Sequence, residues 1–250
     1  MFKTVKGLVL RETKYKEADK ILTVLTESEG KLTVKARGAL RKSCRFSASA
    51  QFLAYSDMTL FGNRGRWSLD EAQSVELFNG LRSDLELLAL ASYFAELLEA
   101  LSDADSPTPE LLRLGLNSLY ALSEKLCKPE QVKAAFELRL MCMTGFEPAL
   151  EGCVQCHEVN ITHPVFCLGA GTLRCAQCRD PEPGPRAFLC ADSLAAARYI
   201  VGAPLRRLFS FSLSDEALRR LNTATEAYLS VQLERSFPAL NYYKSLINYG

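Results

Sequence analysis

The sequence is poor in histidine, with only His157 and His163 in 250 residues. A Ser–His–Asp or Cys–His catalytic arrangement elsewhere in the chain is therefore excluded. The sequence also contains no Gly-x-Gly-x-x-Gly motif and no phosphate-binding loop of the Walker type. Carboxylates are plentiful, but none of them forms a pattern that separates a catalytic pair from a solvated face. We therefore expect that the protein is not an enzyme.

Long hydrophobic runs are also missing. The longest apolar stretch covers residues 87–95 and lies between Glu86 and Glu96, whereas a membrane-spanning helix needs about 20 apolar residues. The apolar run at residues 7–10 is too short for the core of a signal peptide. We expect a cytoplasmic protein with no membrane partner. Because the cytoplasm is reducing, we do not expect its nine cysteines to form a disulfide framework.

Net charge is nearly absent, at +1, but the charges are unevenly distributed. Residues 1–50 hold 12 Lys and Arg against 5 Asp and Glu, a net charge of +7. Residues 51–80 carry −2, residues 81–152 carry −6 and residues 153–250 carry +2. A total near zero would argue against a nucleic-acid partner, whereas the basic N-terminal segment is compatible with one.

The first 80 residues have the pattern of short strands separated by turns. Glu27-Ser28-Glu29-Gly30 predicts a hairpin in which the glycine takes a positive φ. Five short strands with such turns suggest a small closed barrel, of which the OB-fold is the common five-stranded form. The predicted strands cover residues 4–10, 21–26, 31–36, 51–61 and 67–77.

The pattern becomes helical after residue 80. Ser83 and Glu86 form a candidate capping box for a helix that reaches about Leu101. Four further helices are predicted to start near Pro109, Pro129, Asp192 and Ser214 and to end near Leu126, Gly145, Gly202 and Arg235; Pro238 stops the last one. The fold class is thus α+β, with an N-terminal five-stranded OB-fold barrel (residues 1–80) and a helical domain (residues 81–250) that carries a zinc-binding insertion at about 150–188.

The zinc-binding insertion is predicted from two Cys-x-x-Cys pairs, Cys153 with Cys156 and Cys175 with Cys178, which are separated by 18 residues. This spacing is typical of a four-cysteine zinc site. Four thiolates leave a tetrahedral ion no open position, so the predicted zinc is structural. The alternatives are reduced thiols without metal, redox-active pairs, or covalent haem attachment at the Cys-x-x-Cys-His motif that ends at His157.

Basic residues alternate with apolar ones along residues 31–37, which places Lys31, Lys35 and Arg37 on one face of a strand. A cationic barrel face that also carries aromatic rings is typical of proteins that bind single-stranded nucleic acid, because cations follow phosphates and rings stack on bases. For each ring, a place in the core is the competing and favoured interpretation. The candidate aromatic residues are Tyr15, Phe46, Phe52, Tyr55, Phe61 and Trp67.

Three segments together resemble the RecO family of bacterial recombination mediators. They are KGLVLRETKYKEADKILTVLTESEGKLTVKARGALRKSCRFSASAQ near the N-terminus, LRSDLELLALASYFAELLEAL at the first helix, and FELRLMCMTGFEPALEGCVQC leading into the cysteines. The resemblance covers essentially the full length of the chain. It implies an OB-fold that binds DNA, followed by a helical domain with a zinc-ribbon insertion.

The resemblance also implies an activity. The protein would bind single- and double-stranded DNA, anneal complementary strands, and work with RecR to load RecA onto DNA coated by single-strand-binding protein. That work would place it on the nucleoid. The implied DNA-binding residues are Lys31, Lys35, Arg37, Arg41, Lys42, Arg45, Arg64 and Arg66. The C-terminal tail of single-strand-binding protein would bind the helical domain, with Arg113, Lys133 and Arg139 as candidate contacts.

Two other functions remain open at this point. The chain could be a zinc-ribbon accessory factor of transcription or replication, in which the ribbon itself contacts nucleic acid. The segment around the cysteines holds Arg174, Arg179 and Arg186 against four carboxylates, which is a poor phosphate-binding surface. A nuclease or another enzyme is the second alternative, and the sequence gives it little support.

Overall fold

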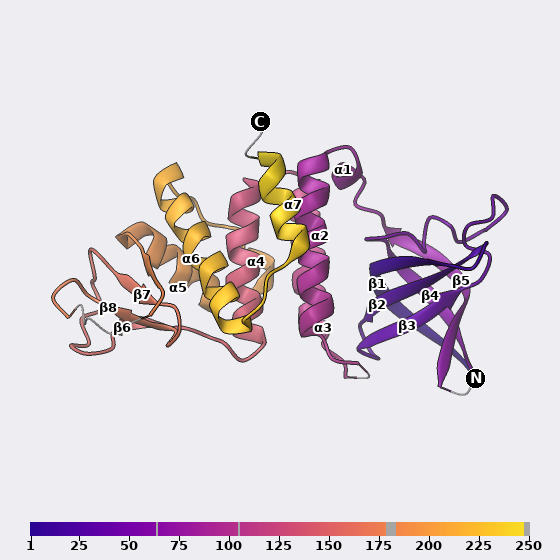
Figure 1. Cartoon of the computed structure of the whole chain (residues 1–250), viewed down its shortest axis with the longest axis horizontal. Coiled ribbons are helices and arrows are strands. Elements are labelled where there is room, and N and C mark those ends of the chain that lie inside the picture. The colour runs from indigo at the N-terminus through magenta and orange to yellow at the C-terminus, as the bar shows by residue number, and fades with distance from the viewer. Residues whose placement is uncertain (64, 105, 179–183, 248–250) are drawn as a thin grey trace. The chain divides into compact units, whose positions relative to one another are not determined.

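The computed structural model describes residues 1–63, 65–104, 106–178 and 184–247 (Figure 1). Its contacts divide the chain into two compact units. Unit 1 consists of Met1–Glu124 together with Phe237–Gly250, and unit 2 consists of Lys125–Ser236. Unit 1 therefore contains both ends of the chain, and unit 2 is inserted between its two pieces.

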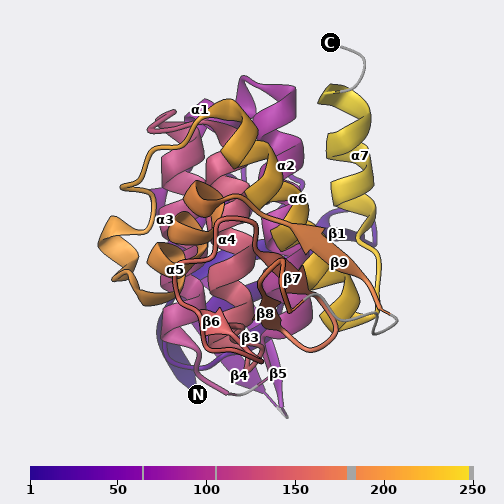
Figure 2. The same cartoon turned by 90° about the vertical axis from the view of Figure 1, so that its left-hand side faces the viewer.

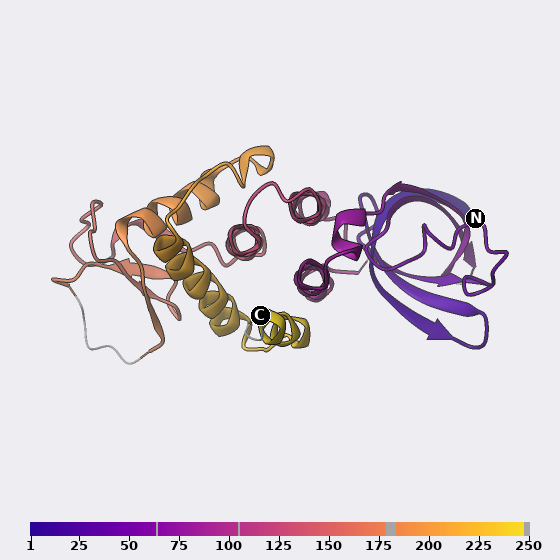
Figure 3. The same cartoon turned by 90° about the horizontal axis from the view of Figure 1, so that it is seen from above.

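Unit 1 begins with a closed five-stranded barrel, as the sequence predicts. The strands follow the order β1-β2-β3-β5-β4, and β4 pairs back onto β1 to close the ring (Figures 1 and 3). Only the β3–β5 pair among these neighbours is parallel. This is an OB-like barrel. The strands are β1 (Phe2–Tyr15), β2 (Asp19–Thr26), β3 (Lys31–Ala36), β4 (Tyr55–Asn63) and β5 (Arg66–Glu76).

Alternation of apolar and polar residues forms the barrel core. In β3, Leu32, Val34 and Ala36 are buried, while the residues between them are more exposed. They pack with residues such as Met58 and Leu60, which are 0 % exposed. Alternate side chains of β3 therefore face the barrel core, and those between them face outward.

The β2–β3 hairpin closes at the turn that the sequence predicts. Gly30 has a φ of +69°, and its carbonyl oxygen accepts hydrogen bonds from the backbone N–H and the hydroxyl of Thr26. A Cβ at Gly30 would lie 2.4 Å from the carbonyl oxygen of Ser106. Glycine is thus required here both by the backbone conformation and by the close approach of residue 106.

The helices of unit 1 follow the barrel. Helix α2 is capped by Asp84, whose side chain accepts a hydrogen bond from the backbone N–H of Leu87, so the expectation of Ser83 as the N-cap is wrong. Pro238 does not stop the helix before it, as expected, because that helix already ends at Leu233 with Glu234 in the left-handed conformation. Pro238 instead begins α7, which the sequence did not predict. Helix α7 packs along α2. The elements are α1 (Asn79–Arg82), α2 (Leu85–Leu101), α3 (Pro109–Ser123) and α7 (Pro238–Ile247).

Unit 2 combines three longer helices with a small sheet. Helix α4 packs against α5 and α6, and the sheet has the strand order β6-β8-β7-β9 (Figure 2). The N-cap of α5 is Cys190, not Asp192 as expected, because the helix starts one residue before Asp192. The elements are α4 (Pro129–Met143), β6 (Ala149–Cys153), β7 (Val165–Cys167), β8 (Thr172–Arg174), β9 (Arg186–Phe188), α5 (Ala191–Gly202), the short 3-10 helix η1 (Leu205–Arg207) and α6 (Asp215–Leu233).

Candidate metal centre and nucleic-acid interface

The structure brings the two cysteine pairs together in unit 2. Cys153 ends β6, and Cys175 follows β8 directly. All four Sγ atoms of Cys153, Cys156, Cys175 and Cys178 lie within 4.8 Å of one another. The Sγ atoms of Cys156 and Cys175 are 3.7 Å apart. Four thiolates bound tetrahedrally at about 2.3 Å from one ion would be about 3.8 Å apart, so this donor set fits a metal ion.

Backbone N–H groups near Cys153 favour the thiolate form of this cysteine. Burial raises the pKa of the Cys153 thiol, but the backbone N–H groups of Cys156, Cys175 and Gln155 outweigh burial and lower that pKa to about 6. Hydrogen bonds with the thiols of Cys156 and Cys175 raise the pKa of Cys178 to about 12. The Cys153 thiolate thus forms readily, whereas the Cys178 thiol keeps its proton until a cation compensates the charge of its thiolate.

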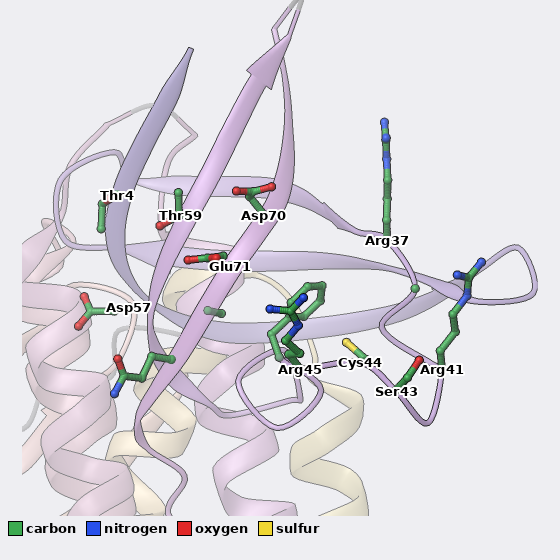
Figure 4. A pocket seen from close by; sticks show the side chains of 14 residues that line it. Thr4, Arg37, Arg41, Ser43, Cys44, Arg45, Asp57, Thr59, Asp70 and Glu71 are labelled. Atoms are coloured by element: carbon green, nitrogen blue, oxygen red, sulfur yellow. The ribbon is translucent and has the colours of Figure 1, made fainter.

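A groove on the barrel holds three of the predicted DNA-binding residues. Arg37, Arg41 and Arg45 are exposed and line it from the segment that connects β3 to β4 (Figure 4). The groove has a volume of about 690 Å³. Within the described part of the chain, the structure shows no ion pair for these three guanidinium groups. They are therefore available to an external anion.

The strands form the opposite wall of this groove. Thr59 on β4 lies between Thr4 on β1 and the carboxylates Asp70 and Glu71 on β5, and Asp57 lies two residues from Thr59 along β4 (Figure 4). The pairing of β4 with β5 shifts register between Thr59 and Leu60, so that Asp70 is an extra residue in β5. Such a bulge places two consecutive carboxylates at the surface. The groove is thus cationic along the connecting segment and anionic along the strands.

Two other predicted cations of β3 already have partners within unit 1. The ammonium group of Lys31 donates a hydrogen bond to the carbonyl oxygen of Glu99, at 2.5 Å. Lys35 lies 2.9 Å from a carboxylate oxygen of Asp19, and its Nζ atom lies 5.0 Å from the centre of the Tyr15 ring. Both lysines therefore contribute to the fold as well as to the positive charge of the barrel.

The remaining predicted DNA-binding residues are spread around the barrel. Lys42 and Arg66 are exposed but do not line the groove. Arg64 lies outside the residues that the structure describes. Of the candidate aromatic residues, Phe46 and Trp67 pack against the core, whereas Tyr15 and Phe61 are 43 % and 39 % exposed. The structure thus separates core rings from rings that can meet a ligand.

Asp19 fastens the basic connecting segment to the barrel. Its carboxylate accepts a 2.8 Å hydrogen bond from the backbone N–H of Gly38, and this bond, followed by the one from Lys35, lowers its pKa. A lowered pKa in the folded state adds stability above the pKa of the unfolded chain, and this stability is lost as the pH falls through the folded value. Gly38, with a φ of +67°, turns the chain at this point.

We expect this carboxyl to titrate below 3.8, its ordinary value. Replacing Lys35 by methionine should raise the Asp19 pKa without restoring it fully, because the hydrogen bond from Gly38 remains. Carbonyl-detected NMR titration of wild type and variant measures both values. An Asp19 pKa at or above 3.8 in the wild type would contradict the anchoring role.

The three candidate partner-binding residues occupy very different positions. Arg113 is exposed and pairs with Glu110 at 2.8 Å. Lys133, a candidate contact for the tail of single-strand-binding protein, has a side chain that is only 1 % exposed and lies between Glu137 and Glu226 in the core of unit 2. Of these three residues, Arg113 is thus the one that an external peptide can reach readily.

Arg139 has a structural role at the end of α5. Its guanidinium group donates hydrogen bonds to the carbonyl oxygens of Ile200, Val201 and Ala203, the last at 3.0 Å. These carbonyls belong to the last turn of the helix and the residue after it, where intrahelical partners are missing. Arg139 thereby supplies hydrogen bonds to the carbonyl oxygens at the C-terminus of α5.

Two family models match the chain. The first, described as Recombination protein O N terminal, covers residues 1–80. The second, described as Recombination protein O C terminal, covers residues 82–241. The chain belongs to the recombination protein O family. Because the two matches follow one another along the chain, the RecO-family relationship includes both the barrel and the cysteine cluster.

Curated relatives agree with this assignment. A DNA repair protein RecO from Symbiobacterium thermophilum is 33 % identical over 245 residues, which span 97 % of this chain and 96 % of the relative. A DNA repair protein RecO from Acetivibrio thermocellus is 30 % identical over 241 residues, spanning 96 % and 95 % of the two chains. Another from Exiguobacterium sibiricum is 33 % identical over 230 residues, spanning 92 % and 91 %. DNA repair is therefore the general function of the RecO family to which the chain belongs.

Among the residues that the structure describes, no helix combines the length and the apolar character that crossing a bilayer requires.

Proposed function

We propose that this chain binds single- and double-stranded DNA, anneals complementary strands, and helps RecR load RecA onto DNA coated by single-strand-binding protein. The observation that carries the proposal is the groove of the OB-like barrel, with Arg37, Arg41 and Arg45 on one wall. Arginine forms charge-assisted hydrogen bonds with phosphate oxygens in a planar, two-pronged geometry. Together with membership of the RecO family, this supports DNA as the ligand.

Annealing follows from charge neutralisation. Two strands repel each other through their phosphates, and each Lys or Arg that binds a phosphate releases a condensed counterion. A chain that holds one strand on an arginine-lined groove lowers the charge that the second strand meets. Such a function needs no bond to be made or broken, which agrees with the expectation that the protein is not an enzyme.

DNA binding and protein binding would be carried out by different segments of the chain. Residues 1–80 would form the DNA-binding domain, and residues 81–250 would contact the protein partners. Arg113, exposed on α3, would meet the acidic tail of single-strand-binding protein. The four cysteines would hold a structural zinc ion, because four thiolates at these distances suit tetrahedral zinc.

The arginine groove can be tested with Arg37→Ala/Arg41→Ala/Arg45→Ala. We expect the annealing rate of complementary strands coated by single-strand-binding protein to fall at least about 10-fold. The slope of log affinity against log salt for single-stranded DNA should become shallower by about 2, because each lost phosphate contact removes about 0.7. Fluorescence anisotropy across a salt series measures the slope.

A charge-matched control is Arg206→Ala/Arg207→Ala/Arg219→Ala, which removes three exposed guanidinium groups from unit 2. It should retain both annealing and the salt slope. Equal losses in the two triple variants would show that net charge, not the groove, determines DNA binding. A wild-type protein that fails to anneal DNA would overturn the proposed function itself.

A further inference from the structure

Two phenylalanine rings lie together on the outside of the barrel. Phe2 is 62 % exposed and Phe61 is 39 % exposed. Their ring centres are 5.1 Å apart, with 52° between the ring planes. A large apolar pair of this kind is costly to leave in water, and an exposed aromatic cluster next to a polar site is typical of a binding surface.

The strand register connects this pair to the arginine groove. Phe2 pairs with Phe61 across β1 and β4, and Thr4 pairs with Thr59 two residues further along both strands. Residues two apart on a strand point to the same face, about 7 Å from each other. Because Thr4 and Thr59 line the groove, the two rings lie on the same outer sheet face, directly beyond its end.

The charges of the groove set the orientation of a bound strand. Asp57, Asp70 and Glu71 on the strands repel phosphates, whereas the arginines of the connecting segment attract them. The phosphates of a bound strand would therefore follow the connecting segment, and its bases would turn toward the sheet. A base in that orientation has the Phe2 and Phe61 rings on the surface next to it.

We propose that Phe2 and Phe61 form a base-stacking subsite for unpaired nucleotides, through which this chain distinguishes single-stranded from double-stranded DNA. The inference rests on the proposed DNA-binding function and deepens it. In a duplex, each base is already stacked between its neighbours and paired, so its ring faces are not available to a protein side chain. The arginines contact phosphates of either form, and the two phenylalanines act only on the single strand.

The test uses Phe2→Ala/Phe61→Ala. Its affinity for a labelled mixed-sequence single strand should fall about 10-fold, which corresponds to about 1.4 kcal/mol and lies within the range for one stacked base. Its affinity for a blunt duplex of the same length should stay within about twofold of wild type. Fluorescence anisotropy at one salt concentration gives both values, and thermal unfolding confirms that the variant is folded.

Two further variants separate stacking from general apolar contact. Phe2→Trp/Phe61→Trp keeps aromatic faces and should retain the single-strand affinity, whereas Phe2→Leu/Phe61→Leu should lose it. Tyr120→Ala/Tyr242→Ala removes two exposed rings from α3 and α7 and serves as the matched control, with no expected change.

Two outcomes would overturn the subsite: unchanged single-strand affinity in the alanine variant, or an equal loss of single-strand and duplex affinity. If the triple arginine variant loses affinity for both DNA forms while the phenylalanine variant loses neither, this inference alone fails. If the triple arginine variant keeps full affinity for both forms, the proposed groove fails, whatever the aromatic variant does.

Discussion

Replacing Lys133 by methionine should lower the free energy of unfolding of unit 2 by about 3–5 kcal/mol at pH 7. The Lys133 ammonium group lies 2.9 Å from Glu137 and 2.9 Å from Glu226, and it donates a 3.2 Å hydrogen bond to the side-chain oxygen of Asn222. The Glu137 side chain is 0 % exposed, and the Thr225 hydroxyl donates to its second oxygen at 2.8 Å. Without the lysine, two carboxylates face each other with no cation between them.

The stability that Lys133→Met loses should depend on pH, because the pKa values of Lys133 and Glu137 are shifted. Burial raises the pKa of Glu137, and Lys133 opposes that shift. Burial would lower the pKa of Lys133, but the two glutamates outweigh burial and raise it, so the lysine stays charged. In the methionine variant, the folded-state pKa of Glu137 rises further above its unfolded value. A group with a raised folded pKa adds stability below its unfolded pKa and loses it as the pH rises. The variant should therefore be less impaired at pH 5 than at pH 8.

Urea unfolding of the full chain, followed by circular dichroism at the two pH values, measures this effect. Lys133→Met/Glu137→Leu should recover most of the lost stability, because it replaces the buried pair with apolar side chains and leaves Glu226, which is 22 % exposed, able to reach water. Lys128→Met, which removes an exposed partner of Asp215, is the control and should leave the melting temperature unchanged. A Lys133→Met variant within about 1 kcal/mol of wild type would contradict the role of the cluster.

Removing the proposed zinc ion should unfold the sheet of unit 2 while the barrel stays folded. Three of its strands, β7, β8 and β9, have only three residues each. Their core is small, with Val165, Phe166 and Leu173 among its buried residues. Structural zinc contributes about 10–16 kcal/mol in small zinc-binding peptides at pH 7, far more than so few apolar side chains supply. We expect Cys175→Ser to lose the ion and the order of this sheet together.

Elemental analysis of protein purified without chelators should find one zinc ion per chain. Hydrogen exchange should then show rapid exchange across β6–β8 in Cys175→Ser, with the barrel strands still protected. Cys167→Ser is the matched control: Cys167 ends β7 but is not one of the four clustered thiols, so this variant should keep its zinc. Absence of zinc in the wild type, or a sheet that stays protected after chelation, would rule the proposal out.

The barrel and the cysteine cluster could be predicted from sequence because their signals are local. Alternation along residues 31–36 identifies β3, and the Cys-x-x-Cys spacing places two thiols near one point whatever surrounds them. The N-cap of α2 could not be predicted, because Ser83 and Asp84 are both good N-cap residues and only the path of the backbone decides between them.

The position of Lys133 could not be predicted because it depends on two helices. Helix α4 is buried over most of its surface, so its polar residues do not mark a solvent-facing side. Glu226, which helps compensate the lysine, comes from α6, and no local pattern connects the two positions. Phe2 posed the same difficulty: an apolar residue at the start of a strand is ordinarily expected inside, and only the pairing with Phe61 reveals the exposed face.

The return of the chain to unit 1 at α7 has a consequence for biosynthesis. Helix α7 packs along α2, and the backbone N–H of Ala239 donates to the Glu96 carboxylate at 3.1 Å. All of unit 2 lies between these two helices in the sequence. On the ribosome, the α2 surface that receives α7 therefore stays uncovered until unit 2 has been translated, even though the barrel is made first. The nascent barrel can fold early, but unit 1 is completed last, so a truncated or stalled product would expose the face of α2 that α7 covers.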